Sequence, residues 1–477
     1  MSIQSAHRSN DENTRPHSGA ASSREADLGS APIGSLLFKL ALPAIAAQII
    51  NVLYNMVDRM YIGHIPDIGP SALTGVGVTM PIIMCISAFA ALAAMGGAPQ
   101  ASILMGKGDK ASAEKVLGNC TFMLTVISLV LTALFLGFGR PILLMFGASE
   151  KTILYAWNYM KIYVCGTFFV QMALGLNAFI NAQGYAKTGM ITVAIGALCN
   201  IILDPIFIFA LNLGIKGAAI ATIISQAISA AWVIRFLTSD KASLRISAQM
   251  MRPQGKLILS IAALGVSPFI MQVTESLITI IFTHGLQKYG DDLYVGSFTI
   301  LQSIMQMIFI PMSGFSQGVQ PIISYNYGAR NPGRVRRAFQ VLLMACLAYS
   351  LLLWALVQLF PQLFALMFTS DSELVSYASW ALRIYMAATG IFGIQIACQQ
   401  TFVALGNAKI SLFLAVLRKI ILLIPFIYIL PNFFADKAFA VFLAEPVADF
   451  LAVCTTATMF AVHFKKSMTA LEGKPGV

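Results

Sequence analysis

Five carboxylates lie inside long apolar stretches of this 477-residue chain, where an ionised side chain is costly to place. They are Asp58, Asp204, Glu275, Glu445 and Asp449. If these stretches cross a membrane, each acid costs about 3 kcal/mol to bury, so such residues usually mark an ion or substrate pathway. The chemistry available to them is reversible binding of a proton or of a hard cation.

Two of these acids have polar neighbours at helical spacing. Asn200 and Asp204 are four residues apart, as are Tyr54 and Asp58, so each pair shares one face of a helix. Pro205 follows Asp204 and removes a backbone donor, which leaves a carbonyl one turn earlier free. Together these oxygens suit a proton or a sodium ion. No other metal site is predicted.

Each acid also has a structural interpretation. Asp58 could pair with Arg59 or lie near the membrane interface, whereas Asp204 has no basic residue within one turn. Glu445 and Asp449 again are four apart, with Pro446 between them. This like-charged pair could exchange protons, form an anionic wall that attracts cations, or line a hydrated vestibule.

Amide side chains occupy two further stretches. They are Gln171, Asn177, Asn181, Gln395, Gln399 and Gln400. Amides within spans more often bond between helices than bind substrate. Both interpretations stay open at this point.

Composition requires that membrane helices position these residues. The chain is 58% hydrophobic and 11% charged, against about 25% charged in a soluble domain, which excludes a water-soluble fold. Runs of the length of a membrane helix predict an all-α integral membrane protein with twelve spans. These spans lie near 36–61, 72–98, 116–138, 153–181, 189–211, 217–237, 257–284, 295–324, 338–360, 374–403, 410–430 and 439–463.

The basic residues predict the orientation of these spans. The connections on one side, with the C-terminal tail, hold 17 lysines and arginines. The connections on the other side hold 5, namely Arg140, Lys151, Lys216, Lys288 and Lys437. The positive-inside rule therefore places both termini in the cytoplasm and all five acids in the outer half of the membrane.

The two halves of the sequence match when one is shifted by 222 residues. Gly96 then aligns with Gly318, and Gly106 with Gly328. We therefore expect two six-helix bundles related by a parallel internal repeat, meeting at a central cleft as in rocking transporters. The predicted parts are a disordered cytoplasmic tail (1–32), an N-terminal lobe (33–237), a cytoplasmic linker (238–256), a C-terminal lobe (257–464) and a second cytoplasmic tail (465–477).

Other function classes find little support in the sequence. The net charge of +11 comes without interleaved basic and aromatic residues, so orientation explains it better than nucleic-acid binding. The sequence has no GxxxxGK[ST] loop for ATP, and its histidines near spans lie at helix ends without metal-ligand spacing. We therefore expect neither an enzyme nor a cofactor.

Several segments together resemble the multidrug and toxic compound extrusion (MATE) transporters, and within them the MepA-like bacterial branch. They include LYNMVDRMYIGHI at the end of the first span, NAQGYAKTG after the fourth and NIILDPIFIF in the fifth. The resemblance covers residues 33 to about 465. It implies a V-shaped pair of six-helix lobes in the plasma membrane and export of diverse, often cationic and amphipathic compounds, including antibiotics, in exchange for sodium or protons.

The resemblance also assigns roles to individual positions. Asp58 and Asp204 match the N-lobe acids that bind the coupling ion, and the polar residues around them are Tyr54, Asn177, Asn181 and Asn200. In the C-terminal lobe, Glu275 resembles an acid on helix seven of a related branch. Where that branch has an acid on helix ten, this chain has glutamines, with candidates Gln395 and Gln399, and we infer that Glu445 and Asp449 substitute.

Two alternatives to the multidrug antiporter remain. A specific metabolite exporter of related fold is one of them. A lipid-linked oligosaccharide flippase, the other, needs basic residues in its cavity, and the repeat-related bases Lys161 and Arg383 are outnumbered by the acids. We expect a monomer that acts on small molecules.

Overall fold

A computed structural model describes residues 28–289 and 292–473, and this part of the chain is helical, without strands. The first half contains α2 (Ile33–Gly63), α3 (Gly69–Gly106), α4 (Lys110–Met145), α5 (Ile153–Cys165), α6 (Thr167–Ala182), α7 (Ala186–Pro205), the π-helix η1 (Ile206–Ala210) and α8 (Ile215–Leu237). The short 3-10 helix η2 (Ala248–Met251) lies in the connection between the halves. The second half contains α9 (Gly255–Tyr289), α10 (Asp292–Gly328), α11 (Pro332–Leu359), α12 (Pro361–Leu366), α13 (Ser372–Tyr385), η3 (Thr389–Ile391), α14 (Phe392–Ala404), α15 (Ala408–Val416), the π-helix η4 (Leu417–Leu423), α16 (Ile424–Ile429), η5 (Leu430–Asn432) and α17 (Lys437–Leu471).

The number of spans agrees with the sequence prediction. In the described part, ten helices are long and apolar enough to cross a membrane, and two bent helix pairs bring the total to twelve. The chain is therefore a multi-pass membrane protein. The predicted spans 153–181 and 374–403 are not straight, because α5 meets α6 at 58° and α13 meets α14 at 49°. Gly166 lies at the first bend, where a β-carbon would overlap the side chain of Ile223.

The internal repeat is visible in where the helices begin. Four pairs of helices start 222 residues apart, namely α2 and α9, α4 and α11, α7 and α15, and α8 and α17. Asp109 and Asn331, separated by the same shift, cap α4 and α11. Asp109 Oδ1 accepts a bond of 3.0 Å from Ser112 N, and Asn331 Oδ1 one of 3.2 Å from Arg334 N. The duplication therefore includes the signals that start helices.

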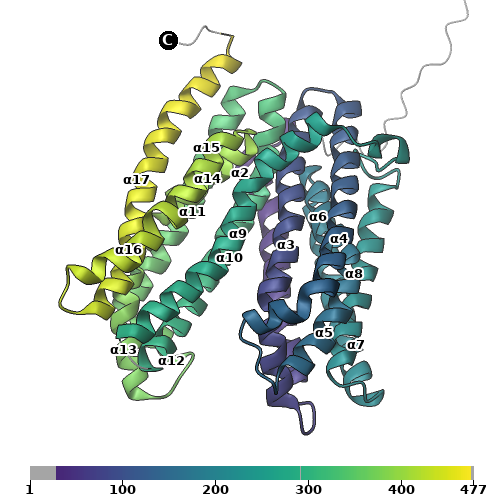
Figure 1. Ribbon diagram of the computed structural model, residues 1–477. Helices are drawn as coiled ribbons and strands as arrows, with labels where there is room; N and C mark the ends of the chain where they lie inside the picture. The colour runs from purple at the N-terminus through teal and green to yellow at the C-terminus, as the bar shows by residue number, and fades with distance from the viewer. Residues whose placement is uncertain (1–27, 290–291, 474–477) are drawn as a thin grey trace, which may run out of the picture.

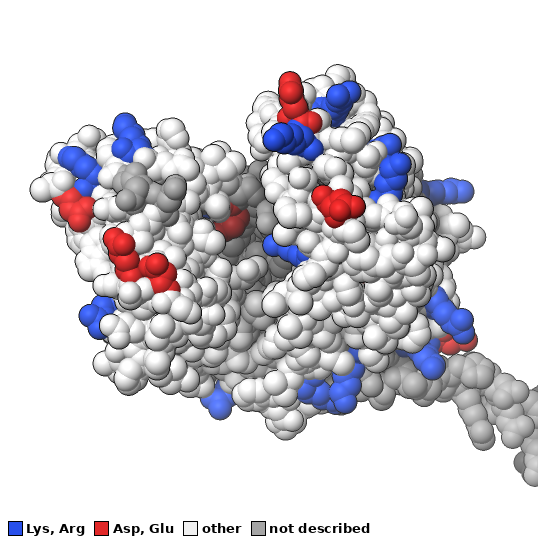
Figure 2. Space-filling model, turned by 90° about the horizontal axis from the view of Figure 1, so that it is seen from below, with Lys and Arg blue, Asp and Glu red and all other residues white. Residues whose placement is uncertain are grey.

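The two halves form two bundles, called here the N-lobe (α2–α8) and the C-lobe (α9–α17), which meet at one end and diverge toward the other (Figure 1). Repeat-related glycines lie at tight contacts between the lobes. A side chain on Gly106 would collide with the backbone of Tyr325, and one on Gly328 with the backbone of Ile103. Seen from the diverging end, a hollow separates the lobes (Figure 2).

Each lobe has its own apolar core, and its outer face is also apolar. Phe179 is fully buried in the N-lobe, while Phe282 and Phe298 stack in the C-lobe with ring centroids 5.0 Å apart. Leu129 and Phe138 on α4 are more than 60% exposed in the isolated chain. Such side chains suit contact with lipid.

The predicted linker 238–256 is packed on the N-lobe. Tyr185 Oη donates to Lys241 O at 2.8 Å, and Gln254 N donates to Asn119 Oδ1 at the same distance. These bonds attach both ends of the connection to the N-lobe rather than leaving it free between the bundles.

Both predicted tails are shorter than expected. Helix α17 continues through much of the predicted tail 465–477, and Met468 is fully buried. Of the predicted tail 1–32, residues 1–27 lie outside the described part. Leu28 is buried, and its carbonyl accepts bonds from Asn326 and Arg334.

Candidate ion and substrate sites

Asp58 of α2 and Asp204 of α7 come together inside the N-lobe. Both are buried, Asp204 completely, and their carboxyl groups lie within hydrogen-bonding reach of each other. Asn200 Nδ2 donates to Asp204 Oδ1 at 3.1 Å and to Thr222 Oγ1 at 3.4 Å. One oxygen of each acid, Asp58 Oδ1 and Asp204 Oδ2, has no hydrogen-bond partner. Two such carboxylates need a shared proton or a bound cation to compensate their charge.

Aromatic residues surround the acid pair, and no basic residue of the described part pairs with it. Tyr54 lies one turn before Asp58 and close to both acids. Tyr159 on α5 is buried near Asp58. Arg59 donates instead toward Met80 Sδ at 3.6 Å, and the described residues include no ion pair of Asp58. The structure thus does not support the structural alternative in which Asp58 pairs with Arg59.

The helix that carries Asp204 changes its winding immediately after it. Pro205 ends α7, and η1 follows with the wider π pattern, as in the 2.8 Å bond from Leu211 N to Ile206 O. A π turn is a strained arrangement that often accompanies functional sites. Helix α8 packs closely against this π-helix at Gly217, where a β-carbon would collide with the backbone of Phe207.

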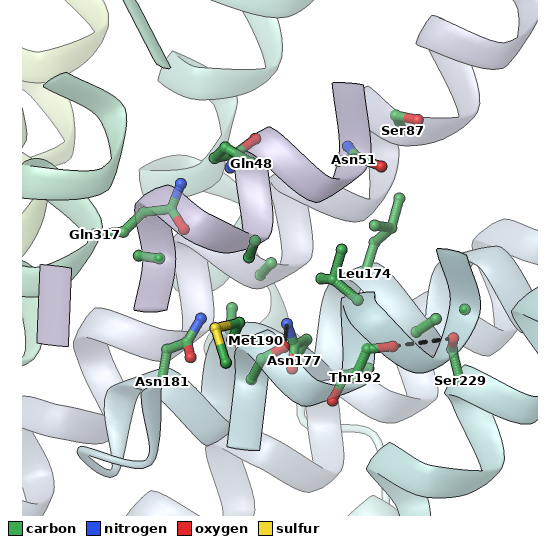
Figure 3. Close-up of a pocket in the computed structure, with 18 of the residues that line it drawn as sticks. Gln48, Asn51, Ser87, Leu174, Asn177, Asn181, Met190, Thr192, Ser229 and Gln317 are labelled. Atoms are coloured by element: carbon green, nitrogen blue, oxygen red, sulfur yellow. Dashed lines mark hydrogen bonds between the residues drawn. The ribbon is translucent and has the colours of Figure 1, made fainter. Parts of the chain in front are cut away.

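A cavity of about 400 Å³ extends from the acid pair toward the C-lobe. Small residues make room for it, and amide side chains supply its polarity (Figure 3). These amides are Gln48, Asn51, Asn177, Asn181, Asn200, Gln226, Gln272, Gln317 and Gln320. No Lys, Arg, Asp or Glu is among the described residues that line it. Its volume suits a drug-sized molecule.

The predicted residues Asn177 and Asn181 lie in this cavity rather than on the acids. Asn177 Nδ2 donates to Gly189 O at 3.2 Å, and its Oδ1 has no partner. Asn181 lies against Gly189, where a β-carbon would collide with it. Tyr54, Asn200 and Thr222 both line the cavity and surround the acids, so they join the two sites.

In the C-lobe, the three predicted acids contact two bases. Arg418 Nε donates to Asp449 Oδ1 at 2.6 Å, and Arg418 Nη2 donates to Glu445 Oε1 at 3.2 Å. Lys419 Nζ lies 3.1 Å from Glu275 Oε2. Four of these side chains are at most 8% exposed, whereas Glu275 is 55% exposed. The predicted like-charged pair Glu445 and Asp449 is therefore part of an ion cluster.

Arg418 and Lys419 were not predicted as site residues. The only sign of them in the sequence is a pair of adjacent bases inside the apolar run 410–430. In the structure they belong to the π-helix η4, which directs Arg418 toward α17 and Lys419 toward α9. Arg418 also stacks over the ring of Phe392, 4.3 Å from its centroid.

Gln395 and Gln399 border a pocket of only about 30 Å³ beside these bases. Gln399 Nε2 donates to Ser411 O at 2.9 Å and to Ser267 Oγ at 3.2 Å, so it links helices. Gln395 Oε1 is buried without a partner. This pocket lies where the repeat places the large cavity of the N-lobe.

The difference between the two pockets follows from the residues at equivalent positions. Gly196 and Ala197 line the large cavity, and their equivalents at the shift of 222 are Arg418 and Lys419. Long basic side chains in the C-lobe therefore fill the space that small residues leave open in the N-lobe.

Comparisons with known proteins agree with this architecture. The family model MatE matches residues 43–206 and again residues 268–429, one match in each lobe. The multidrug export protein MepA of Staphylococcus haemolyticus is 25% identical over 419 residues, which are 87% of this chain and 92% of that protein. MepA of Staphylococcus aureus is 23% identical over 443 residues, which are 92% and 96% of the two chains.

Solved structures show the same fold. A MATE protein crystallised in its bent conformation has a TM-score of 0.88 at 20% identity, covering 95% of this chain and 99% of its own. An outward-facing multidrug resistance MATE transporter has a TM-score of 0.85 at 21% identity, covering 93% and 98%. With the family match on both lobes, it follows that this chain belongs to the MatE family of multidrug efflux transporters.

Proposed function

We propose that the chain is a secondary active antiporter that exports amphipathic, often cationic small molecules in exchange for protons or sodium ions. The observation that carries the proposal is the pair Asp58 and Asp204, which is buried beside a drug-sized cavity and has no basic partner among the described residues. The negative charge of this pair needs a cation to compensate it, and either a proton or a sodium ion can serve.

Coupling follows from the residues that the two sites share. Asn200 holds Asp204 and also lines the cavity, and Tyr54 does the same beside Asp58. An ion bound at the acids changes the charge and hydrogen bonding of these residues. Substrate and ion therefore influence each other's affinity, which is the thermodynamic requirement for exchange.

The orientation follows from the positive-inside rule. We place the protein in the plasma membrane with both termini in the cytoplasm. The closed end of the V is then cytoplasmic, and the hollow opens to the outside of the cell. In this conformation the cavity releases substrate and the acids take up external ions. Rocking of the lobes about the glycine contacts at Gly106 and Gly328 would open the opposite side.

The cavity lining supports a transporter of small molecules over a flippase. A pyrophosphate-linked substrate calls for basic side chains, and the described lining contains none. The amides offer hydrogen-bond donors and acceptors, which also suits a specific metabolite as substrate. One chain contains both sites, so we propose that the monomer is the working unit.

The proposal is tested by Asp204→Asn in proteoliposomes, with efflux of ethidium as a cationic probe driven by a proton or a sodium gradient alone. We expect uptake of neither ion to drive efflux in this variant. Asp240→Asn is the matched control, because Asp240 lies in the exposed connection with a side chain 96% exposed. Gradient-driven efflux that persists in Asp204→Asn under both gradients contradicts the coupling site.

A further inference from the structure

Among the described residues, the ion cluster of the C-lobe has one more acid than it has bases. Glu275, Glu445 and Asp449 face Arg418 and Lys419. Except for Glu275, these side chains are nearly inaccessible to water. An unbalanced negative charge in such a place is costly.

The distances show which acid lacks a cation of its own. Lys419 Nζ forms an ion pair with Glu275 Oε2 at 3.1 Å. Arg418 forms its short bond of 2.6 Å with Asp449, and only the longer one of 3.2 Å with Glu445. The second oxygen of Glu445, Oε2, is buried and has no hydrogen-bond partner among the described residues. Glu445 is therefore the acid whose charge is least compensated.

The titratable groups that face Glu445 come from four elements, α17, η4, α9 and α13. Asp449 lies one turn along α17, Arg418 and Lys419 come from η4, and Glu275 from α9. Tyr385 of α13 is buried beside the same acids. Both bases already have carboxylate partners, so a neutral Glu445 balances the cluster.

We propose that Glu445 is a second proton-binding site, which holds a proton in this outward-open conformation. A proton fits this site better than a sodium ion. Sodium needs several converging oxygens, and among the described residues no three His, Cys, Asp or Glu side chains converge on one point. Two positive side chains beside Glu445 also repel a metal ion, whereas a proton joins the carboxyl covalently.

Glu275 connects this site with the hollow between the lobes. It lies three residues after Gln272, which lines the large cavity, so the two share a face of α9. Its half-exposed carboxylate is bonded to Lys419, the neighbour of Arg418. Protons from the hollow can therefore reach the cluster through Glu275 and Lys419.

Infrared difference spectroscopy tests the proposal without any transport. The band to follow is the carbonyl stretch of a neutral carboxylic acid, recorded for purified protein from mildly acidic to alkaline pH, in water and in heavy water. The background is the double variant Asp58→Asn and Asp204→Asn, which removes the N-lobe acids. A failure of the proposed coupling at those acids therefore does not affect the result.

We expect a titrating carboxylic-acid band that shifts in heavy water and is lost completely in Glu445→Gln. The variant Asp449→Asn removes the acid closest to Arg418, so Glu445 becomes the carboxylate that balances this base, and the band should titrate at lower pH. Absence of the band before Glu445→Gln is introduced, its retention in Glu445→Gln, or an unchanged titration in Asp449→Asn overturns the proposal. Suppression of the band when choline chloride is replaced by sodium chloride also overturns it, because the site would then bind sodium.

Discussion

Replacing Arg418 by methionine isolates the energy of the C-lobe ion cluster. The guanidinium of Arg418 donates to Asp449 at 2.6 Å in a place where Asp449 is only 3% exposed. Breaking a buried ion pair by removing one partner costs about 3–5 kcal/mol, because the remaining charge is left uncompensated. Loss of the cation–π contact with Phe392 adds about 0.5–2 kcal/mol. Methionine keeps most of the apolar contact, so the charge is the main change.

The assay is unfolding in mixed micelles, followed by tryptophan fluorescence. Trp380 is a local reporter, since its ring lies 6.3 Å from that of Phe442 on α17. We expect Arg418→Met to lower the free energy of unfolding by at least about 3 kcal/mol. Adding Asp449→Asn should recover most of that loss. Adding Glu445→Gln should recover less than about 1 kcal/mol, the value of one neutral hydrogen bond, because Glu445 is already uncharged.

Two outcomes refute this reasoning. If Arg418→Met stays within about 0.5 kcal/mol of the unmodified protein, as surface substitutions do, the cluster is hydrated and its charges are not buried. If Glu445→Gln restores stability and Asp449→Asn does not, the carboxylate that Arg418 neutralises is Glu445. The shorter distance from Arg418 to Asp449 (2.6 Å) than to Glu445 (3.2 Å) would then not indicate which acid is charged.

Three further predictions concern the lobe contact, the cavity and a helix cap. Gly106→Leu should destabilise the contact between the lobes at the closed end of the V by about 1–3 kcal/mol. The measurement is the distance between spin labels on the two lobes, which should increase. The control Gly34→Leu should leave it unchanged, because a side chain there has open space. Ala178→Trp should fill the cavity and weaken ethidium binding at least about tenfold, a loss of about 1.4 kcal/mol. Unchanged affinity there, or equal loss in the outward-facing Leu198→Trp, would contradict the assignment. Asp109→Ala should lower the unfolding free energy by about 1 kcal/mol through loss of the cap on α4, and no change in thermal stability would count against that bond.

The helices and their repeat were predictable because they depend on local sequence. Apolar length predicts spans, and the turn residues Asp109 and Asn331 recur at the shift that relates the halves. The bends within 153–181 and 374–403 were not predicted. Hydrophobic length does not depend on the direction of a helix axis, and the contact of Gly166 with Ile223 is a tertiary one.

The acids of the candidate sites were predictable from the sequence, but the bases of the C-lobe ion cluster were not. Asp58 and Asp204 stand out because an isolated acid in an apolar run is conspicuous. Arg418 and its acid partners are 27 and 31 residues apart in the chain, so no helical spacing connects them. The π-helix that turns Arg418 and Lys419 toward different helices also has no signature in a hydropathy pattern.

The repeat provides two similar scaffolds, but the chemistry differs between them. Asp204 has Phe426 as its equivalent at the shift of 222, and Arg418 has Gly196. The two lobes therefore share helix starts and lobe contacts, whereas the acids and bases of the candidate sites have no charged equivalent in the other lobe. This asymmetry has a mechanical consequence. Two lobes of similar architecture can rock against each other at low energetic cost. An ion bound in only one lobe, or a different ion site in each lobe, favours one conformation and so biases the direction of that motion.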